Sequence, residues 1–317
     1  MGTFNASSGG DFILLGFSDQ PQLEPIISVA VLLFYLMTVL SNTAIILVFS
    51  LDSRLHTPMY FFLTNLSFLD ICYTTSVVPQ MLVNLWGPNK LITYAGCFLQ
   101  FFFAFDFGAI ECLLLAVMAY DCYAAVCQPL HYMVIMHPQF CKKMVAASWL
   151  TGLGGAPGVS SFTFTLPRCG HHTIDDFFCE IPAFLKIICE YTKIIDAFIY
   201  ILGVLYLLLP LFVILISYAV ITQAVTKIKS GRGWKKVLNT CSSHLTVVSL
   251  FYGSAIYMYL QPKKSFSYNV DKFISLFYTI ITPSLNPLIY TLRNKDIKVA
   301  LKCLFIRIQG SEQMSIE

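Results

Sequence analysis

Seven long apolar runs constrain the fold of this chain more than any other feature of its sequence. A helix needs about 20 mostly apolar residues to cross a bilayer, and each run is close to or beyond that length. Strands of a membrane β-barrel would instead alternate over segments of about ten residues. We therefore predict an all-α bundle of seven transmembrane helices. The predicted spans are residues 26–49, 58–82, 98–120, 144–166, 196–224, 237–260 and 273–290.

The composition also indicates a membrane protein. Charged residues make up 12% of the 317 residues and hydrophobic residues 57%, whereas soluble proteins contain about 25% charged residues. The fourth run is the least regular, because Gly154, Gly155, Pro157 and Gly158 interrupt it. Small residues let membrane helices approach one another closely, so this run is retained as a span.

The distribution of basic residues predicts the orientation in the membrane. Seven spans place the termini on opposite sides, and 13 of the 20 Lys and Arg residues fall on the side of the C-terminus. Cytosolic loops are enriched in basic residues, which places the C-terminus in the cytosol. We predict three segments: an extracellular tail over residues 1–25, the membrane domain over residues 26–291 and a cytosolic tail over residues 292–317.

The cytosolic tail begins with an amphipathic pattern. Ile297 and Ala300 are interspersed with Lys298 and Lys302. This pattern is typical of a helix that lies on the membrane surface, and we predict a short helix of that kind after the last span.

The predicted topology divides the 11 cysteines between two compartments. Cys97, Cys169, Cys179 and Cys189 lie on the extracellular side, where disulfides persist, and four cysteines allow three pairings. The other seven are expected to be free thiols or small buried side chains. Asn5 opens an Asn-Ala-Ser sequon in the extracellular tail and is the predicted glycosylation site.

Two acidic residues lie deep within predicted spans, where an ionisable group is costly and marks a functional site. Asp70 and Glu111 each lie roughly 17 Å from the cytosolic end of their span, and Asn42 and Asn286 can join them. We expect either a sodium site or a hydrogen-bonded packing cluster there, and no other cofactor. Asp106 lies nearer the extracellular end and is expected to reach the lipid headgroups.

A candidate cavity lies in the outer half of the predicted bundle. The small residues Gly108 and Ala109 face aromatic side chains, an arrangement that can leave an apolar pocket with a few hydroxyl groups. The alternative is ordinary aromatic packing between helices. The aromatic candidates are Phe105, Tyr252, Tyr259 and Tyr278.

Catalytic signatures are absent from the sequence. It contains no HExxH, GxSxG, GxxxxGK[ST] or CxxC motif, so we expect no enzyme and no metal other than sodium. A transporter would show inverted repeats, and none are visible. Five basic residues between Lys227 and Lys236 suit an acidic cytosolic protein partner. Membrane lipids are the other expected partners, and nucleic acid is not expected.

Five stretches resemble the signature motifs of the vertebrate odorant receptors, in particular the tetrapod-type class. They occur in the family's order on five of the seven predicted spans. They read LHTPMYFFL at 55–63, MAYD at 118–121, SY at 217–218, TCSSHL at 240–245 after Lys236, and PSLNPLIY at 283–290 followed by LRN. The chain is thus similar over essentially its whole length to a family of rhodopsin-like G-protein-coupled receptors.

The resemblance implies a receptor that binds small, volatile, mostly apolar odorants in the outer half of the bundle. It further implies activation of a stimulatory olfactory G protein, which raises cyclic AMP. The expected location is the plasma membrane, in the cilia of olfactory sensory neurons.

The resemblance also implies roles for individual residues. It places Tyr252 at the base of the odorant pocket, adds Ala255 to the lining and matches Asp70 and Glu111 to an acidic ion-site pair. The implied disulfides are Cys97–Cys179 and Cys169–Cys189. The residues implied in coupling and activation are Asp121, Cys122, Tyr123, Tyr218, Lys236, His244 and Tyr290.

One departure from the family pattern concerns coupling. The family motif on the third span is Met-Ala-Tyr-Asp-Arg-Tyr, and this chain has Cys122 in place of the Arg. A thiol cannot make the charge-assisted contacts of a guanidinium group, so Asp121 loses that partner. We predict weakened G-protein coupling. The alternatives are a ligand-binding receptor with little or no output and, less favoured, a membrane transporter.

Overall fold

The helices begin where the local sequence favours a first turn. Pro25, Pro58 and Pro138 lie in the first turn of three helices, where a missing N–H leaves no hydrogen bond unmade and the fixed φ angle suits the helix. Thr93 caps a fourth helix by accepting a hydrogen bond from the Gly96 N–H. The computed structural model describes residues 10–88, 90–190, 192–226, 231–260, 268–293 and 297–302.

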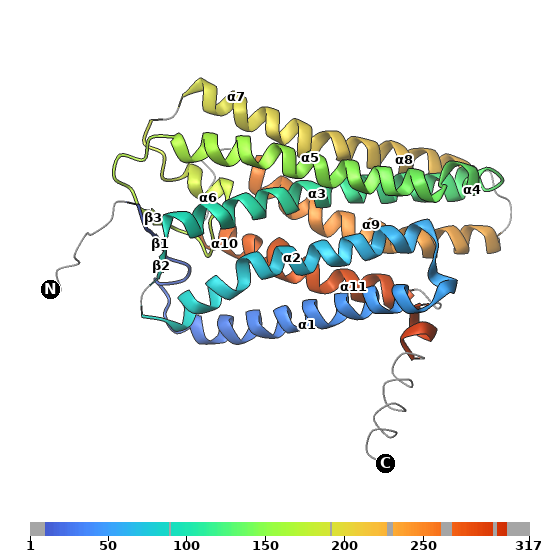
Figure 1. Ribbon diagram of the computed structural model, residues 1–317, viewed down its shortest axis with the longest axis horizontal. Helices are drawn as coiled ribbons and strands as arrows, with labels where there is room; N and C mark the ends of the chain where they lie inside the picture. The colour runs from blue at the N-terminus through green and yellow to red at the C-terminus, as the bar shows by residue number, and fades with distance from the viewer. Residues whose placement is uncertain are drawn as a thin grey trace, which may run out of the picture.

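Seven helical units lie side by side in one bundle (Figure 1), which confirms the predicted fold class. Five units are single long helices, and the fifth and seventh units each contain a π-helical segment. The single helices are α1 (Glu24–Leu51), α2 (Pro58–Trp86), α3 (Tyr94–Cys127), α5 (Pro138–Thr165) and α9 (Gly231–Leu260). The fifth unit is α7 (Lys193–Leu202), η2 (Gly203–Leu208) and α8 (Leu209–Thr226); the seventh is α10 (Tyr268–Leu276), η4 (Phe277–Ile281) and α11 (Thr282–Arg293).

Five units in the described part of the chain have the length and apolar character of a membrane span. The other two, α5 and α9, complete the bundle with more small and hydroxyl-bearing residues. Helix α5 begins at Pro138, earlier than the predicted boundary at residue 144, because the proline can start the helix ahead of its apolar run. The described part of the predicted surface helix, residues 297–302, is helical.

The outward faces of the bundle are apolar. Ile26, Leu33 and Leu40 of α1 are 67%, 62% and 70% exposed. Leu209 and Phe212 of α8 are exposed in the same way. Continuous apolar faces of this kind on a long helix suit a lipid environment, because a soluble monomer rarely leaves so large a patch in water.

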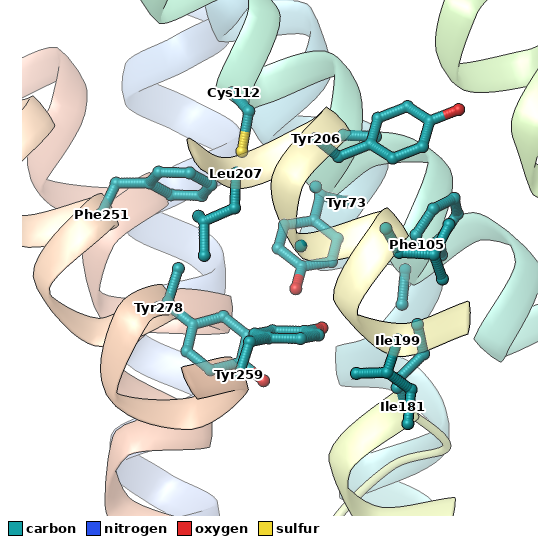
Figure 2. A pocket seen from close by; sticks show the side chains of 16 residues that line it. Tyr73, Phe105, Cys112, Ile181, Ile199, Tyr206, Leu207, Phe251, Tyr259 and Tyr278 are labelled. Carbon is teal, nitrogen blue, oxygen red and sulfur yellow. The ribbon is translucent and has the colours of Figure 1, made fainter. Parts of the chain in front are cut away.

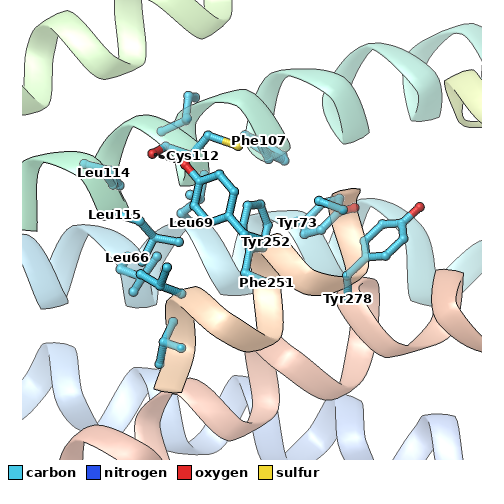
Figure 3. Close-up of a cluster of buried hydrophobic side chains, with 14 of the residues drawn as sticks. Leu66, Leu69, Tyr73, Phe107, Cys112, Leu114, Leu115, Phe251, Tyr252 and Tyr278 are labelled. Atoms are coloured by element: carbon cyan, nitrogen blue, oxygen red, sulfur yellow. Dashed lines mark hydrogen bonds between the residues drawn. The ribbon is translucent and has the colours of Figure 1, made fainter. Parts of the chain in front are cut away.

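Helix α3 is the central helix of the bundle and packs against α2, α5, α8 and α9. Leu66 and Leu69 of α2 are buried beside Leu114 and Leu115 of α3, and Figure 3 shows this layer extending to Tyr252 of α9. Lipid tails are as apolar as leucine, so close packing rather than the hydrophobic effect holds such a layer together. This layer holds α3 and α9 in contact below the cavity of the bundle.

Short strands cover the end of the bundle that carries the N-terminus. The strand β1 (Phe12–Leu14) pairs antiparallel with β2 (Leu91–Ile92) and parallel with β3 (Thr173–Ile174). The Arg168 guanidinium lies over the Phe12 ring, 5.2 Å from its centroid. Part of the predicted extracellular tail is therefore integrated into an ordered cap.

Candidate ligand-binding site

A cavity of about 90 Å³ opens between α3, the fifth unit, α9 and η4, at the end of the bundle nearer the strands (Figure 2). Its wall is mostly apolar. The lining residues are Tyr73, Ala104, Phe105, Gly108, Ala109, Cys112, Ile181, Ile199, Leu202, Gly203, Tyr206, Leu207, Phe251, Ala255, Tyr259 and Tyr278. Such an apolar wall with a few hydroxyls suits a small molecule with little polarity.

Sequence reasoning identified part of this wall. Six of the seven residues proposed as ligand contacts line the cavity: Phe105, Gly108, Ala109, Ala255, Tyr259 and Tyr278. A side chain at position 108 would have open space, because a Cβ built on Gly108 meets no atom within 4 Å.

The structure places Tyr252 beneath the cavity rather than in its wall. Its side chain is 2% exposed, and its hydroxyl donates a hydrogen bond of 3.1 Å to the backbone carbonyl of Cys112. Figure 3 shows the ring turned from α9 toward α3, in the packed layer below the cavity. A buried hydroxyl needs a partner, and the carbonyl of α3 supplies it, so Tyr252 joins two helices beneath the pocket.

Several lining residues could not be found from helical spacing. Two of them, Tyr206 and Leu207, lie in η2. A π-helical turn rotates the following side chains relative to an α-helix, and no signal in the sequence locates such a turn. Ile181 reaches the wall from α6 (Ile181–Leu185), a short helix in the loop after β3.

The cavity has one polar edge. Figure 2 shows the hydroxyls of Tyr73, Tyr259 and Tyr278 directed toward the same part of the cavity. The Tyr278 hydroxyl donates a hydrogen bond to the carboxylate of Glu180, and Ser275 Oγ lies 3.3 Å from an oxygen of Glu180 and from one of Asp176. The apolar wall is thus joined to an acidic group outside it.

Both carboxyl groups behind this edge are buried in the loop. Burial, together with the negative charge of Asp176, raises the pKa of Glu180 to about 8. Burial likewise raises the pKa of Asp176 to about 7, although the Phe177 N–H donates a hydrogen bond of 2.7 Å to its carboxylate. A raised carboxyl pKa means that negative charge is under-compensated at this place.

Two ion pairs fasten the same loop to α10. Lys186 Nζ lies 3.1 Å from the Asp271 carboxylate, and Lys272 Nζ lies 2.5 Å from that of Asp175. Asp271 and Lys272 are almost completely buried. Buried pairs of this kind fix relative position more than they add stability, so they hold the loop in register over the cavity.

The structure brings the predicted acidic pair together inside the bundle. Asn286 of α11 donates to the Asp70 carboxylate at 3.1 Å, while Asn42 of α1 donates to the Pro283 carbonyl at 3.2 Å. Glu111 faces Asp70 closely enough for their charges to interact. Among the described residues, three buried oxygens here accept no hydrogen bond: Asn42 Oδ1, Glu111 Oε1 and Asn286 Oδ1. Free carboxylate and amide oxygens are the ligands that a hard cation prefers, so the residues fit a sodium ion.

The expectation for Asp106 is wrong. Its side chain is 0% exposed and faces α5 rather than the headgroups, because Gly152 leaves room there: a Cβ at residue 152 would lie 2.5 Å from Asp106 Oδ1. Within the described part of the chain, neither carboxylate oxygen has a hydrogen-bond partner.

At the cytosolic half, His244 connects three helices. Its Nε2 lies 3.0 Å from the Leu115 carbonyl of α3, so Nε2 carries the proton and donates. Its Nδ1 then accepts from the Tyr218 hydroxyl of α8 at 2.8 Å. Tyr290 of α11 is buried nearby on the same half of the bundle. The side chain of Lys236 and the sequon at Asn5 lie outside the described residues.

Comparison with known proteins decides the family. The family of olfactory receptors matches residues 31–307. The chain belongs to the olfactory receptor family. This olfactory receptor is similar to Olfactory receptor 2W1 of Homo sapiens, with 56% identity over 95% of this chain and 94% of that protein. It is also similar to Olfactory receptor 2C1 of Mus musculus, with 54% identity over 96% of this chain and 98% of that protein.

The fold of this olfactory receptor is that of rhodopsin. A crystal structure of squid rhodopsin superposes with a TM-score of 0.73 at 16% identity, over 91% of this chain and 87% of that chain. The receptor is therefore a multi-pass membrane protein and a G-protein-coupled receptor rather than an enzyme, and odorants and G proteins are its classes of partner. Two disulfides with the pairing implied by the family resemblance tie its outer loop: Cys97–Cys179 and Cys169–Cys189.

In this olfactory receptor the Cys122 thiol lies in an apolar cluster at the cytosolic end. It is 1% exposed and packs with Ile221 and Val225 of α8 and with Cys241 of α9. The neighbouring Asp121 accepts a hydrogen bond of 2.8 Å from the Tyr132 hydroxyl. Tyr123 accepts one of 3.2 Å from Gln128. Residue 122 therefore contributes an apolar contact where the family pattern has a cation.

Proposed function

We propose that this receptor binds small, volatile, mostly apolar odorants in the cavity and activates a stimulatory olfactory G protein to raise cyclic AMP. The observation that carries the proposal is the cavity itself, which lies between α3, the fifth unit, α9 and η4 and has a mostly apolar lining. The proposed location is the plasma membrane of the cilia of olfactory sensory neurons.

The signal passes from the cavity along α9. A ligand touches Ala255 and Tyr259, which lie on α9 above the Tyr252 hydrogen bond to α3. His244 makes the next polar contact of α9 with α3, farther toward the cytosol. These contacts can be either made or broken, depending on the position of α9. A ligand that binds more tightly to one position of α9 increases the population of receptors in that arrangement. Release of α9 from α3 then opens the cytosolic face to the G protein.

The acidic pair is proposed to hold a sodium ion. Asp70 and Glu111 supply the charge, and Asn42 and Asn286 supply amide oxygens. The ion would balance one negative charge of two carboxyl groups that face one another within the bundle. Its binding would favour the arrangement in which α2, α3 and α11 lie close together.

Cys122 favours a second candidate, a receptor that binds odorant with little output. The thiol is buried among apolar side chains and offers no positive charge to a G protein. Charge-assisted hydrogen bonds are about twice as strong as neutral ones, so loss of the guanidinium removes a strong contact of the active state. The proposed coupling is therefore weak.

Cyclic AMP in transfected cells tests both candidates. Wild type, Cys122→Arg and Cys122→Ser are compared at equal surface expression against a panel of odorants. We expect a weak response in wild type, a response about tenfold stronger in the Arg variant and no gain in the Ser variant, which changes the side chain without adding charge. Equal responses of wild type and Cys122→Arg would contradict weak coupling. No response of any variant to any odorant would contradict the proposed receptor activity.

A further inference from the structure

Negative charge is in excess where the outer loop meets α10. Among the described residues, two lysines and four acidic residues gather there, and ion pairs join Lys186 to Asp271 and Lys272 to Asp175. The remaining acids, Asp176 and Glu180, are 1% and 3% exposed, and no ion pair to either of them occurs within the described residues.

The groups that donate hydrogen bonds to these two acids are neutral. Ser275 lies between the two carboxylates, the Phe177 N–H donates to Asp176, and the Tyr278 hydroxyl donates to Glu180. Hydrogen bonds satisfy the oxygen atoms but do not supply the positive charge that a buried carboxylate calls for. Burial and the neighbouring charge of Asp176 raise the pKa of Glu180 in these surroundings.

The Tyr278 side chain joins Glu180 to the cavity. Tyr278 both lines the cavity and donates to Glu180. Figure 2 shows its ring beside that of Tyr259, with Tyr73 across the cavity, so three electron-rich rings surround the polar edge. The hydroxyl oxygens of these tyrosines can accept hydrogen bonds from an ammonium group, and the carboxylates behind Tyr278 attract the same charge.

We propose that the cavity selects protonated aliphatic amines, with the ammonium group between Tyr73, Tyr259 and Tyr278 and its charge balanced by Glu180 and Asp176. The alkyl chain lies on the apolar wall formed by residues such as Ala109 and Leu207. The inference rests on the proposed function, because it names the ligand class of the same cavity. A carboxylate ligand is disfavoured, since it would add a third negative charge to the polar edge.

The proposal also fixes a direction of pH dependence. Glu180 balances an ammonium ion only when it is ionised, and its pKa is raised to about 8. Among the other charged groups that face Glu180, Lys186 lowers this pKa and Asp176 raises it. Amine affinity should therefore increase as the pH rises from about 6.5 to about 8.5, a range in which an alkylamine stays protonated. Affinity for the matching alcohol should not change in this way.

Ligand binding to the purified full-length receptor tests the proposal without a signalling step. The probes are n-hexylamine, hexan-1-ol, hexanal and hexanoic acid, and affinity is measured from the ligand-dependent shift in thermal unfolding. We expect hexylamine to bind about tenfold more tightly than hexanol at about pH 8, as for a charge-assisted hydrogen bond in place of a neutral one. Hexanoic acid should bind most weakly.

Two variants identify the groups responsible. Glu180→Gln should abolish the preference for the amine over the alcohol, whereas Glu190→Gln, which removes an exposed acid of the same loop, should keep it. If Glu180→Gln does not fold, the wild-type receptor still tests the proposal. The ratio of its affinity for hexylamine to its affinity for hexanol is then measured as a function of pH. Equal binding of hexylamine and hexanol, or a flat pH profile, would overturn the amine assignment.

The two proposals can fail separately. Binding of hexanol or hexanal without preference for the amine overturns the ligand class and leaves the odorant-binding cavity supported. Binding of none of the four probes overturns the amine assignment, and the odorant panel in cells then decides the proposed function independently.

Discussion

Tyr132 donates a hydrogen bond of 2.8 Å to Asp121, the acidic residue beside Cys122 at the cytosolic end of α3. The tyrosine lies in α4 (Tyr132–Ile135), a short helix in the loop between α3 and α5. The family motif provides an adjacent arginine at residue 122, and here a loop hydroxyl contacts the carboxylate instead. The acid is thus held by a neutral donor, and the loop is anchored to α3.

Tyr132→Phe should lower the stability of the receptor by about 1–3 kcal/mol, since a buried acceptor would lose its donor. Thermal unfolding of the purified protein measures the loss. The matched control is Asp121→Asn combined with Tyr132→Phe in a double-mutant cycle. If the two single substitutions act additively, Asp121 and Tyr132 do not interact as described.

Gly152→Ala should destabilise the contact between α3 and α5. A Cβ at residue 152 would lie 2.5 Å from Asp106 Oδ1 and 2.6 Å from Ile110 Cγ1. Overpacking of this kind costs about 1–3 kcal/mol. Gly158→Ala on the same helix is the control, because its Cβ meets nothing within 4 Å. Equal melting temperatures of both variants would contradict the close approach at Gly152.

Gly108→Leu should block the cavity without disturbing the bundle. The Cβ position is open, and Gly108 lines the cavity, so the added side chain fills the space that a ligand would take. Odorant affinity should fall by roughly tenfold or more at unchanged surface expression. Gly253→Leu places the same side chain on an exposed position of α9 and should leave affinity unaltered. A normal response of Gly108→Leu would show that odorants bind elsewhere.

Acidification should stabilise the outer loop. Burial raises the pKa of Asp176 to about 7 and that of Glu180 to about 8, so the folded loop binds protons more tightly than an unfolded chain with carboxyl pKa values of about 4. Stability gained from this difference is absent above about pH 8 and grows as the pH falls toward 5. Hydrogen exchange of residues 175–186 at several pH values measures it. Slower exchange at high pH than at low pH, after correction for intrinsic rates, would contradict the prediction.

The sequence predicts the seven spans and part of the cavity wall, because both depend on local signals. Long apolar runs define membrane helices, and Gly108 and Ala109 mark a place where side chains leave space. The rise per residue of an α-helix predicts that Asp70 and Glu111 lie at the same depth in the membrane. In the structure their carboxyl groups are close enough for their charges to interact.

The remaining features depend on three-dimensional relations that no local pattern contains. Tyr206 faces the cavity because η2 changes the helical phase. Glu180 reaches the polar edge because the loop that carries it folds back over the bundle. The pattern of apolar residues in a sequence does not predict the path of such a loop. Asp106 lies inside rather than at the headgroups because of a glycine on another helix.

The strand β1 lies near the start of the described chain, and it pairs with segments that are far away in the sequence and are synthesised much later. Phe12 pairs with Ile92, and Leu14 pairs with Ile174, so the central strand must wait for its second partner until four helices have entered the membrane. Contacts this distant in sequence close slowly. We therefore expect completion of this small sheet to be a late step in the folding of the receptor.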